Sequence, residues 1–113
     1  MPLPHDKELV MYSRTMPCPF LSIARQVLGK QNVPYRELFI DRDPEYERRV
    51  VEWTGFRSIP TLIITKPGEE VPYEKPAPLK PGESPRGINR GSMLTEASED
   101  ELITWLRQHG FVE

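Results

Sequence analysis

The residue with the clearest chemical potential in this chain of 113 residues is its single cysteine, Cys18. It lies between two prolines in the run Met16-Pro-Cys-Pro-Phe-Leu-Ser22. Proline suits the first position of a helix, because the N–H that it lacks would be unpaired there, so Pro19 predicts a helix with Cys18 as its N-cap. Unpaired backbone N–H groups and the positive end of the helix dipole would favour the nucleophilic thiolate at this position.

A structural role for Cys18 is the alternative, because a free cysteine often packs in a protein interior as a small hydrophobic residue. The placement between two prolines at a predicted helix start favours the reactive thiol. Arg14, four residues earlier, would add a positive charge near the sulfur.

A second motif, Thr54-Gly-Phe-Arg-Ser-Ile-Pro-Thr61, precedes a short apolar segment. A proline cannot donate a ladder hydrogen bond, so Pro60 marks the entry of a strand. About 5–6% of X–Pro bonds in folded proteins are cis, so the sequence physics taken alone predicts a trans bond between Ile59 and Pro60.

Alternating strand and helix patterns predict the elements that position these two motifs. We expect strands at residues 8–13, 35–40 and 61–65, and a further short strand within residues 88–94. Three helices are predicted by start signals and by apolar positions at helical spacing: Pro19 with Phe20, Ile23, Ala24, Val27 and Leu28; Asp43-Pro44 with Tyr46, Val50 and Trp53; and the capping box Ser98–Glu101 with Leu102, Ile103, Trp105 and Leu106.

The chain contains 13 prolines, and six of them fall within residues 66–90 together with three glycines. This composition predicts an extended surface loop inserted into a single domain of residues 1–113. A loop of this length within a compact domain is usually functional or disordered.

Composition also excludes several classes of protein. One cysteine rules out an internal disulfide and a multi-cysteine zinc site. Fifteen basic and seventeen acidic residues, a net charge of −2, do not indicate a nucleic-acid or anionic-membrane partner. No apolar run reaches the roughly 18 residues of a membrane span, and the first ten residues lack the apolar stretch of a secretory signal, so we expect a cytoplasmic protein.

The two motifs together, about forty residues apart in a β-α-β-α-β order, resemble those of the glutaredoxin family. Its members carry Cys-Pro-Tyr-Cys at the first helix and Thr-Gly-x-Arg-Thr-Val-Pro before a strand. The resemblance implies a thioredoxin-like (glutaredoxin-type) three-layer α/β/α sandwich with a mixed four-stranded sheet, here with the Pro-rich insertion. It also implies that Pro60 is cis and faces Cys18.

Carried over residue by residue, the resemblance implies roles for several positions. Cys18 would be the nucleophile, and Ile59 would offer its backbone to an extended peptide such as glutathione. Arg14 and Arg57 would hold a carboxylate, and Phe20 would wall the sulfur. The remaining expected thiol-binding residues are Pro19, Ser58, Pro60, Gly91 and Ser92. Without the resemblance, plain surface charge would describe the two arginines, and core packing would describe Phe20.

The chain departs from the family pattern at two places. Leu21 stands where the second cysteine would be, so a small thiol must resolve the reaction. The family's Gly-Gly-x-Asp-Asp site, which captures the amino end of glutathione, maps onto Gly91-Ser-Met-Leu-Thr95 without the acidic pair. The co-substrate is therefore either glutathione or another low-molecular-weight thiol. The Cys-Gly-Phe-Ser motif of cluster-binding members is also missing, so we expect no metal and no tightly bound cofactor.

These observations predict a monothiol thiol–disulfide oxidoreductase that acts on mixed disulfides through Cys18. Its partners would be a small thiol and disulfide-containing protein clients, and the chain would be a monomer. Two alternatives remain. The first is a non-catalytic thioredoxin-fold module whose Pro-rich loop docks a partner, and the second is a redox sensor in which Cys18 links two copies of the chain.

Overall fold

The computed structural model describes residues 6–113. Within them the elements follow in the order β1 (Glu8–Ser13), α1 (Pro19–Lys30), β2 (Arg36–Phe39), α2 (Pro44–Thr54), β3 (Thr61–Thr65), β4 (Met93–Thr95) and α3 (Glu99–Gln108). Among residues 6–113 we find no candidate for a membrane-spanning helix.

The strands form one mixed sheet in the order β2-β1-β3-β4. β1 runs parallel to β2 and antiparallel to β3, and β3 runs antiparallel to β4. The register pairs Tyr12 with Thr61 and Thr61 with Thr95. The end of β1, the start of β3 and the end of β4 therefore meet at one edge of the sheet.

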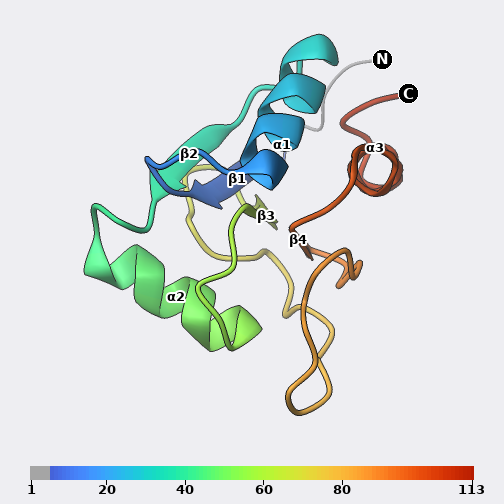
Figure 1. Ribbon diagram of the computed structural model, residues 1–113. Helices are drawn as coiled ribbons and strands as arrows, with labels where there is room; N and C mark the ends of the chain where they lie inside the picture. The colour runs from blue at the N-terminus through green and yellow to red at the C-terminus, as the bar shows by residue number, and fades with distance from the viewer. Residues whose placement is uncertain (1–5) are drawn as a thin grey trace.

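Helices cover both faces of this sheet. α1 and α3 contact each other on one face, and α2 lies on the other (Figure 1). The central strand β3 is buried at every position from Thr61 to Thr65. This arrangement is the thioredoxin-like, glutaredoxin-type three-layer sandwich that the resemblance implies.

The helix starts agree with the sequence signals. Cys18 is the N-cap of α1, the Asp43 side chain accepts a hydrogen bond from the Glu45 N–H at 2.9 Å, and Ser98 and Glu101 form a capping box at α3. The buried face of α1 differs from the expectation. Leu21 is fully buried with Ala24, Val27 and Leu28, whereas Phe20 and Ile23 are half-buried. The helix is therefore rotated, so that Phe20 lies at the border of the core.

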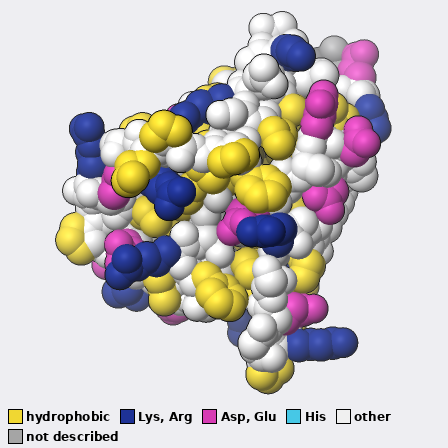
Figure 2. Space-filling view, viewed as in Figure 1, with side chains coloured by type: hydrophobic (Ala, Val, Ile, Leu, Met, Phe, Trp, Pro, Cys, Tyr) yellow, Lys and Arg dark blue, Asp and Glu magenta, His cyan; other side chains and the backbone are white. Residues whose placement is uncertain are grey.

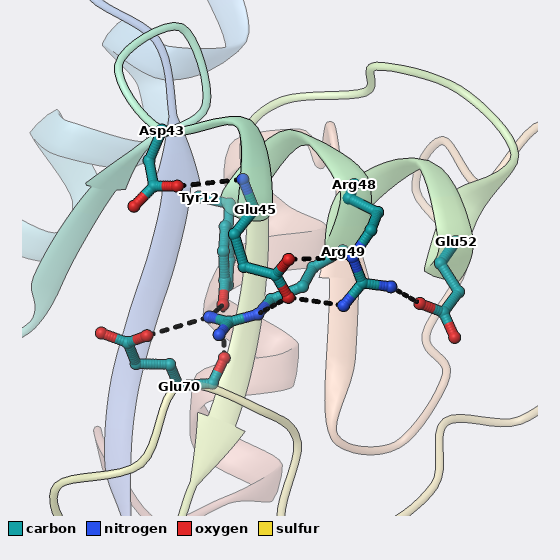
Figure 3. Close-up of polar contacts among 7 residues, drawn as sticks. All are labelled: Tyr12, Asp43, Glu45, Arg48, Arg49, Glu52 and Glu70. Carbon is teal, nitrogen blue, oxygen red and sulfur yellow. Dashed lines mark hydrogen bonds and ion pairs between the residues drawn. The ribbon is translucent and has the colours of Figure 1, made fainter.

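Aromatic packing and a polar network, the latter shown in Figure 3, fix α2 to the sheet. The ring of Tyr12 on β1 packs edge-to-face against Trp53 and Tyr46 of α2, with centroids 5.3 and 5.9 Å apart. The Tyr12 hydroxyl donates to the Glu70 carbonyl and accepts from Arg49 Nη1 at 3.2 Å, and burial raises the pKa of Tyr12. Arg49 Nη1 also contacts Glu70 Oε1 at 2.9 Å. The network thus joins β1, α2 and the start of the insertion.

The Pro-rich insertion, residues 66–90, contains no helix or strand, and its backbone is bound to the rest of the fold at several points. Tyr73 N–H donates to the Ile64 carbonyl at 2.9 Å, and the Ser92 hydroxyl donates to the Glu74 carbonyl at 2.6 Å. Arg90 is 7% exposed and donates to the carbonyls of Ala77 and Trp53, each at 2.7 Å. The insertion is therefore a tethered loop.

The strand expected within residues 88–94 forms one step later, as Met93–Thr95. Arg90 N–H bonds the Met93 carbonyl at 3.0 Å across Gly91, whose φ of +78° places it in the left-handed region. A turn of this kind interrupts an extended ladder, so β4 begins only after it.

Figure 2 shows charged side chains of both signs on one face of the molecule, with acidic side chains gathered over α3.

Candidate active site

Cys18 lies where β1 leads into α1, with the extended backbone of an N-cap (φ −153°, ψ 134°). Its carbonyl accepts the first bond of the helix, from the Ser22 N–H at 3.0 Å. The side chain makes no capping hydrogen bond, and the thiol is free and half-buried against the core. Cys18 is therefore the N-cap residue at the positive pole of a twelve-residue helix.

The segment between β1 and Cys18 is anchored by a carboxylate from the connection between β2 and α2. Asp41 accepts hydrogen bonds from the N–H of Thr15, at 3.0 and 3.2 Å, and from the Thr15 hydroxyl. The pKa of Asp41 is lowered, mainly by the hydroxyl hydrogen bond. This anchor fixes the turn that leads into the N-cap.

The second motif forms the loop between α2 and β3. Gly55 ends α2 in the left-handed region (φ +81°), and the Thr54 hydroxyl accepts from the Phe56 N–H at 3.1 Å. Ser58, Ile59 and Pro60 are buried, and the Ile59–Pro60 bond is cis. The loop therefore delivers Pro60 to the sheet edge at which β1 ends and α1 begins.

The backbone of Ile59 is free to pair. Among residues 6–113, no hydrogen bond engages its N–H or its carbonyl. Its neighbours are engaged, because the Thr61 hydroxyl donates to the Ser58 carbonyl at 2.8 Å and the Pro60 carbonyl accepts from Glu96 N–H at 2.9 Å. An unpaired peptide group beside a strand start suits an extended ligand that pairs by backbone hydrogen bonds.

The end of β4 completes this edge of the sheet. The Thr61 and Thr95 hydroxyl oxygens lie 3.1 Å apart, and Glu96 follows with a left-handed φ of +48°. The next residues enter α3 through the capping box, in which Glu101 Oε1 accepts from the Ser98 N–H at 2.8 Å. Sequence reasoning missed Glu96 and included Thr95 only as the last residue of the mapped segment 91–95, because their relation to Pro60 arises only from the pairing of β3 with β4.

The expected cationic and aromatic residues lie around the same edge. Arg14 directly follows β1 at the start of the β1–α1 connection and is half-buried. Its Nε is buried without a hydrogen-bond partner among the described residues. Arg57 is 75% exposed at its side chain and lies 3.3 Å from Glu47 Oε1. Pro19 is exposed at the start of α1, and Phe20 beside it is half-buried. Both arginines are thus accessible to solvent at least in part.

The expectation that Gly91 and Ser92 belong to the site is wrong, because the structure does not bring them to this edge of the sheet. Since β4 runs antiparallel to β3, its start lies at the opposite edge, where Ser92 carbonyl accepts from the Ile64 N–H at 2.9 Å. Gly91 carbonyl accepts from Trp105 Nε1 at 2.8 Å. Thr95 lies three residues after Ser92, which corresponds to about 10 Å along an extended strand. The mapping onto residues 91–95 placed the site one strand length too early.

Within residues 6–113, no group of three or more His, Cys, Asp or Glu side chains is arranged to hold a metal ion. The chemistry that the edge supplies is that of a free thiol at a helix N-terminus, an unpaired peptide group at Ile59, and nearby guanidinium groups. These are the parts needed to bind an extended molecule with a sulfur atom and to exchange that sulfur with Cys18.

Comparison with known proteins identifies similar chains. The glutaredoxin family model matches residues 9–67, more than half of the chain. Six solved protein chains match, among them a crystal structure of a wheat glutaredoxin with 18% identity and a TM-score of 0.47, over 90% of this chain and 72% of that one. No curated protein sequence matches.

Proposed function

The chain belongs to the glutaredoxin family, and from this premise we propose that it is a thiol–disulfide oxidoreductase that acts on mixed disulfides through Cys18. Glutaredoxins use glutathione as a co-substrate. The observation that carries the proposal is the free thiol of Cys18 at the N-terminus of α1, on the sheet edge that also holds the unpaired backbone of Ile59.

The proposed reaction has two exchanges at one sulfur. The Cys18 thiolate attacks the small-thiol sulfur of a protein mixed disulfide, so that the protein thiolate leaves, takes a proton, and Cys18 becomes joined to the small thiol. A second small thiolate then attacks the small-thiol sulfur of that disulfide, which forms the symmetric disulfide and regenerates the Cys18 thiolate. Leu21 occupies the position of a resolving cysteine, so the second exchange is intermolecular.

Substrate binding would use the groups around the sulfur. The Ile59 N–H and carbonyl would pair with the backbone of an extended thiol such as glutathione, and Arg14 and Arg57 would bind its carboxylate. Pro19, Phe20, Ser58 and Pro60 would enclose the sulfur. The proposed clients are disulfide-containing proteins, acted on by a cytoplasmic monomer in a compartment where small thiols keep most cysteines reduced.

Turnover measured on a glutathionylated peptide tests this function. Protein with glutathione should release the free peptide thiol over many cycles, and Cys18→Ser should release none beyond the uncatalysed rate. Ser22→Ala, an exposed change in the same helix, should retain the activity. Equal rates for the wild-type protein and Cys18→Ser would refute the proposal.

A second candidate function has an observation of its own. A cleft of about 730 Å³ lies between the end of α2 and the insertion; it is lined by Trp53, Phe56, Pro76, Leu79 and Arg90 among others. Such a cleft suits a binding module in which Cys18 is not catalytic. The pH dependence of Cys18 alkylation separates the two: a midpoint below about pH 7 supports the enzyme, and one near 8.5 or above supports the module.

A further inference from the structure

The far end of the Pro-rich insertion returns to the edge of the sheet that carries the candidate site. Arg86 forms a parallel β-bridge with Thr95, and Gly87 N–H donates to the Thr95 carbonyl at 2.7 Å. Pro85, just before them, is buried. Backbone hydrogen bonds and a buried proline thus fix residues 85–87 beside the last residue of β4.

This placement brings the Arg86 side chain over the first turn of α1, the helix that Cys18 caps. The guanidinium carbon lies 5.1 Å from the ring centroid of Phe20, within the range of a cation–π contact. Phe20 is two residues from Cys18 and in the first turn of α1. A residue of the insertion, 68 positions along the chain from Cys18, therefore lies over the first turn of the helix that presents the thiol.

Glu96 orients the guanidinium from the other side. Arg86 Nε and Nη2 each lie 2.9 Å from Glu96 Oε2. The Glu96 backbone N–H in turn donates to the Pro60 carbonyl. The ion pair is therefore held next to the loop between α2 and β3. Phe20, Glu96 and the bridge to Thr95 hold Arg86 from three sides.

The exposure of the two partners shows which charge a ligand would meet. The Arg86 side chain is 63% exposed, whereas that of Glu96 is 15% exposed. Arg86 Nη1 has no hydrogen bond with any residue in the 6–113 range. The site therefore presents an oriented guanidinium edge to solvent, and this edge matches the geometry of a carboxylate.

We propose that Arg86 is a specificity-determining residue of the Cys18 site, which selects small thiols and disulfides that carry a carboxylate. The proposal rests on the function proposed above and assigns a role to the insertion. Arg14 and Arg57 come from the β1–α1 and α2–β3 connections, whereas Arg86 adds a cation on the β4 side. The preferred partner therefore bears anionic groups on both sides of its sulfur.

Two chromogenic disulfides of different charge test this selection. 5,5′-Dithiobis(2-nitrobenzoate) carries two carboxylates, and 4,4′-dithiodipyridine is neutral at pH 7. With either reagent the Cys18 thiolate attacks one sulfur, forms a mixed disulfide and expels one coloured thiol. Cys18 is the chain's single cysteine, so the burst reports this site alone.

Arg86→Gln should slow the reaction with the dianionic reagent about five-fold, as expected for the loss of one nearby charge in water, and should change the neutral reagent's rate less than two-fold. Glu96→Gln removes the carboxylate that pairs with the Arg86 guanidinium, so it should increase the rate of reaction with the dianionic reagent. Lys66→Gln, an equal charge loss in the insertion at the opposite edge of the sheet, should leave both rates unchanged. The selectivity of the wild-type protein should also fall as salt is added.

An equal slowing of both reagents by Arg86→Gln would overturn the proposal and make Arg86 a packing residue of the loop. Rates equal to those of the wild-type protein would overturn it as well. A failure of the proposed function would look different. In that case the protein would not turn over the glutathionylated peptide, although Cys18 would still discriminate between the two reagents.

Discussion

Asp41 illustrates how a single side chain outside the recognised motifs supports the proposed nucleophile, Cys18. It binds the N–H and hydroxyl of Thr15, three residues before Cys18, and comes from the connection between β2 and α2. The position of the thiol therefore depends on a carboxylate 23 residues away in the sequence. No local pattern indicates this contact, because it is made only when β1 and β2 pair in parallel.

We expect acid to release this anchor. Because the folded-state pKa of Asp41 is lowered, its contribution to stability is present above the unfolded value of about 3.9 and is lost as the pH falls through the folded pKa. Asp41→Asn should therefore lower the melting temperature relative to wild type at pH 7, and the difference should shrink below about pH 4. A difference that is unchanged at pH 3 in thermal unfolding would show that the carboxylate charge is not involved.

Arg57 allows a second test on a single side chain. Its guanidinium is exposed and pairs with Glu47, so it is available to a substrate carboxylate at little structural cost. Arg57→Gln should raise KM for the glutathionylated peptide about five-fold, equivalent to one exposed ion pair of about 1 kcal/mol, with kcat nearly unchanged. Arg48→Gln, which removes an arginine paired within α2, is the matched control. A fall in kcat with KM unchanged would contradict a binding role.

Helix α3 shows what local sequence signals determine. Its start is set by the reciprocal hydrogen bonds of Ser98 and Glu101, and its buried side by Leu102, Trp105 and Leu106. Ser98→Ala should lower the free energy of unfolding by about 1 kcal/mol, because the Glu101 N–H loses its acceptor. Urea unfolding measures this, with the exposed Thr104→Ala as control. An unchanged midpoint would mean that the cap does not stabilise α3.

The sequence predicted the elements that carry their own start and stop signals. Pro19, Asp43-Pro44, Gly55 and the capping box lie within one turn of the boundary that each defines, so the helices begin as expected. β4 was predicted less well, since its three residues have no pattern apart from their pairing with β3. For the same reason Gly91 and Ser92 were placed at the wrong edge of the sheet.

At the level of the whole molecule, the insertion links parts of the fold that the sequence keeps apart. Arg90 binds Ala77 within the insertion and Trp53 at the end of α2, and Arg86 reaches Phe20 and Glu96. Long-range contacts of this kind have no short-range sequence signal. The loop was therefore predicted as a surface segment without any indication that it joins the candidate site.

An anchoring residue of the insertion and its local turn at residues 80–83 should respond differently to mutation. Arg90→Met should lower the free energy of unfolding by about 2 kcal/mol, because the carbonyls of Ala77 and Trp53 lose their buried donor. Replacing residues 80–83 with two glycines should change it by less than about 0.6 kcal/mol, because their hydrogen bonds are local to the turn. Denaturant unfolding of both variants measures the contrast, and equal losses would contradict it.

Mass spectrometry of the stalled reaction tests the central claim most directly. Reduced protein, mixed with a glutathionylated peptide in the absence of free thiol, should gain one glutathione as a disulfide on Cys18 while one equivalent of free peptide thiol is released. Peptide mapping should place the modification on the fragment containing Cys18. Addition of glutathione should then remove it. Peptide thiol released without an adduct on Cys18, or no reaction at all, would contradict the account.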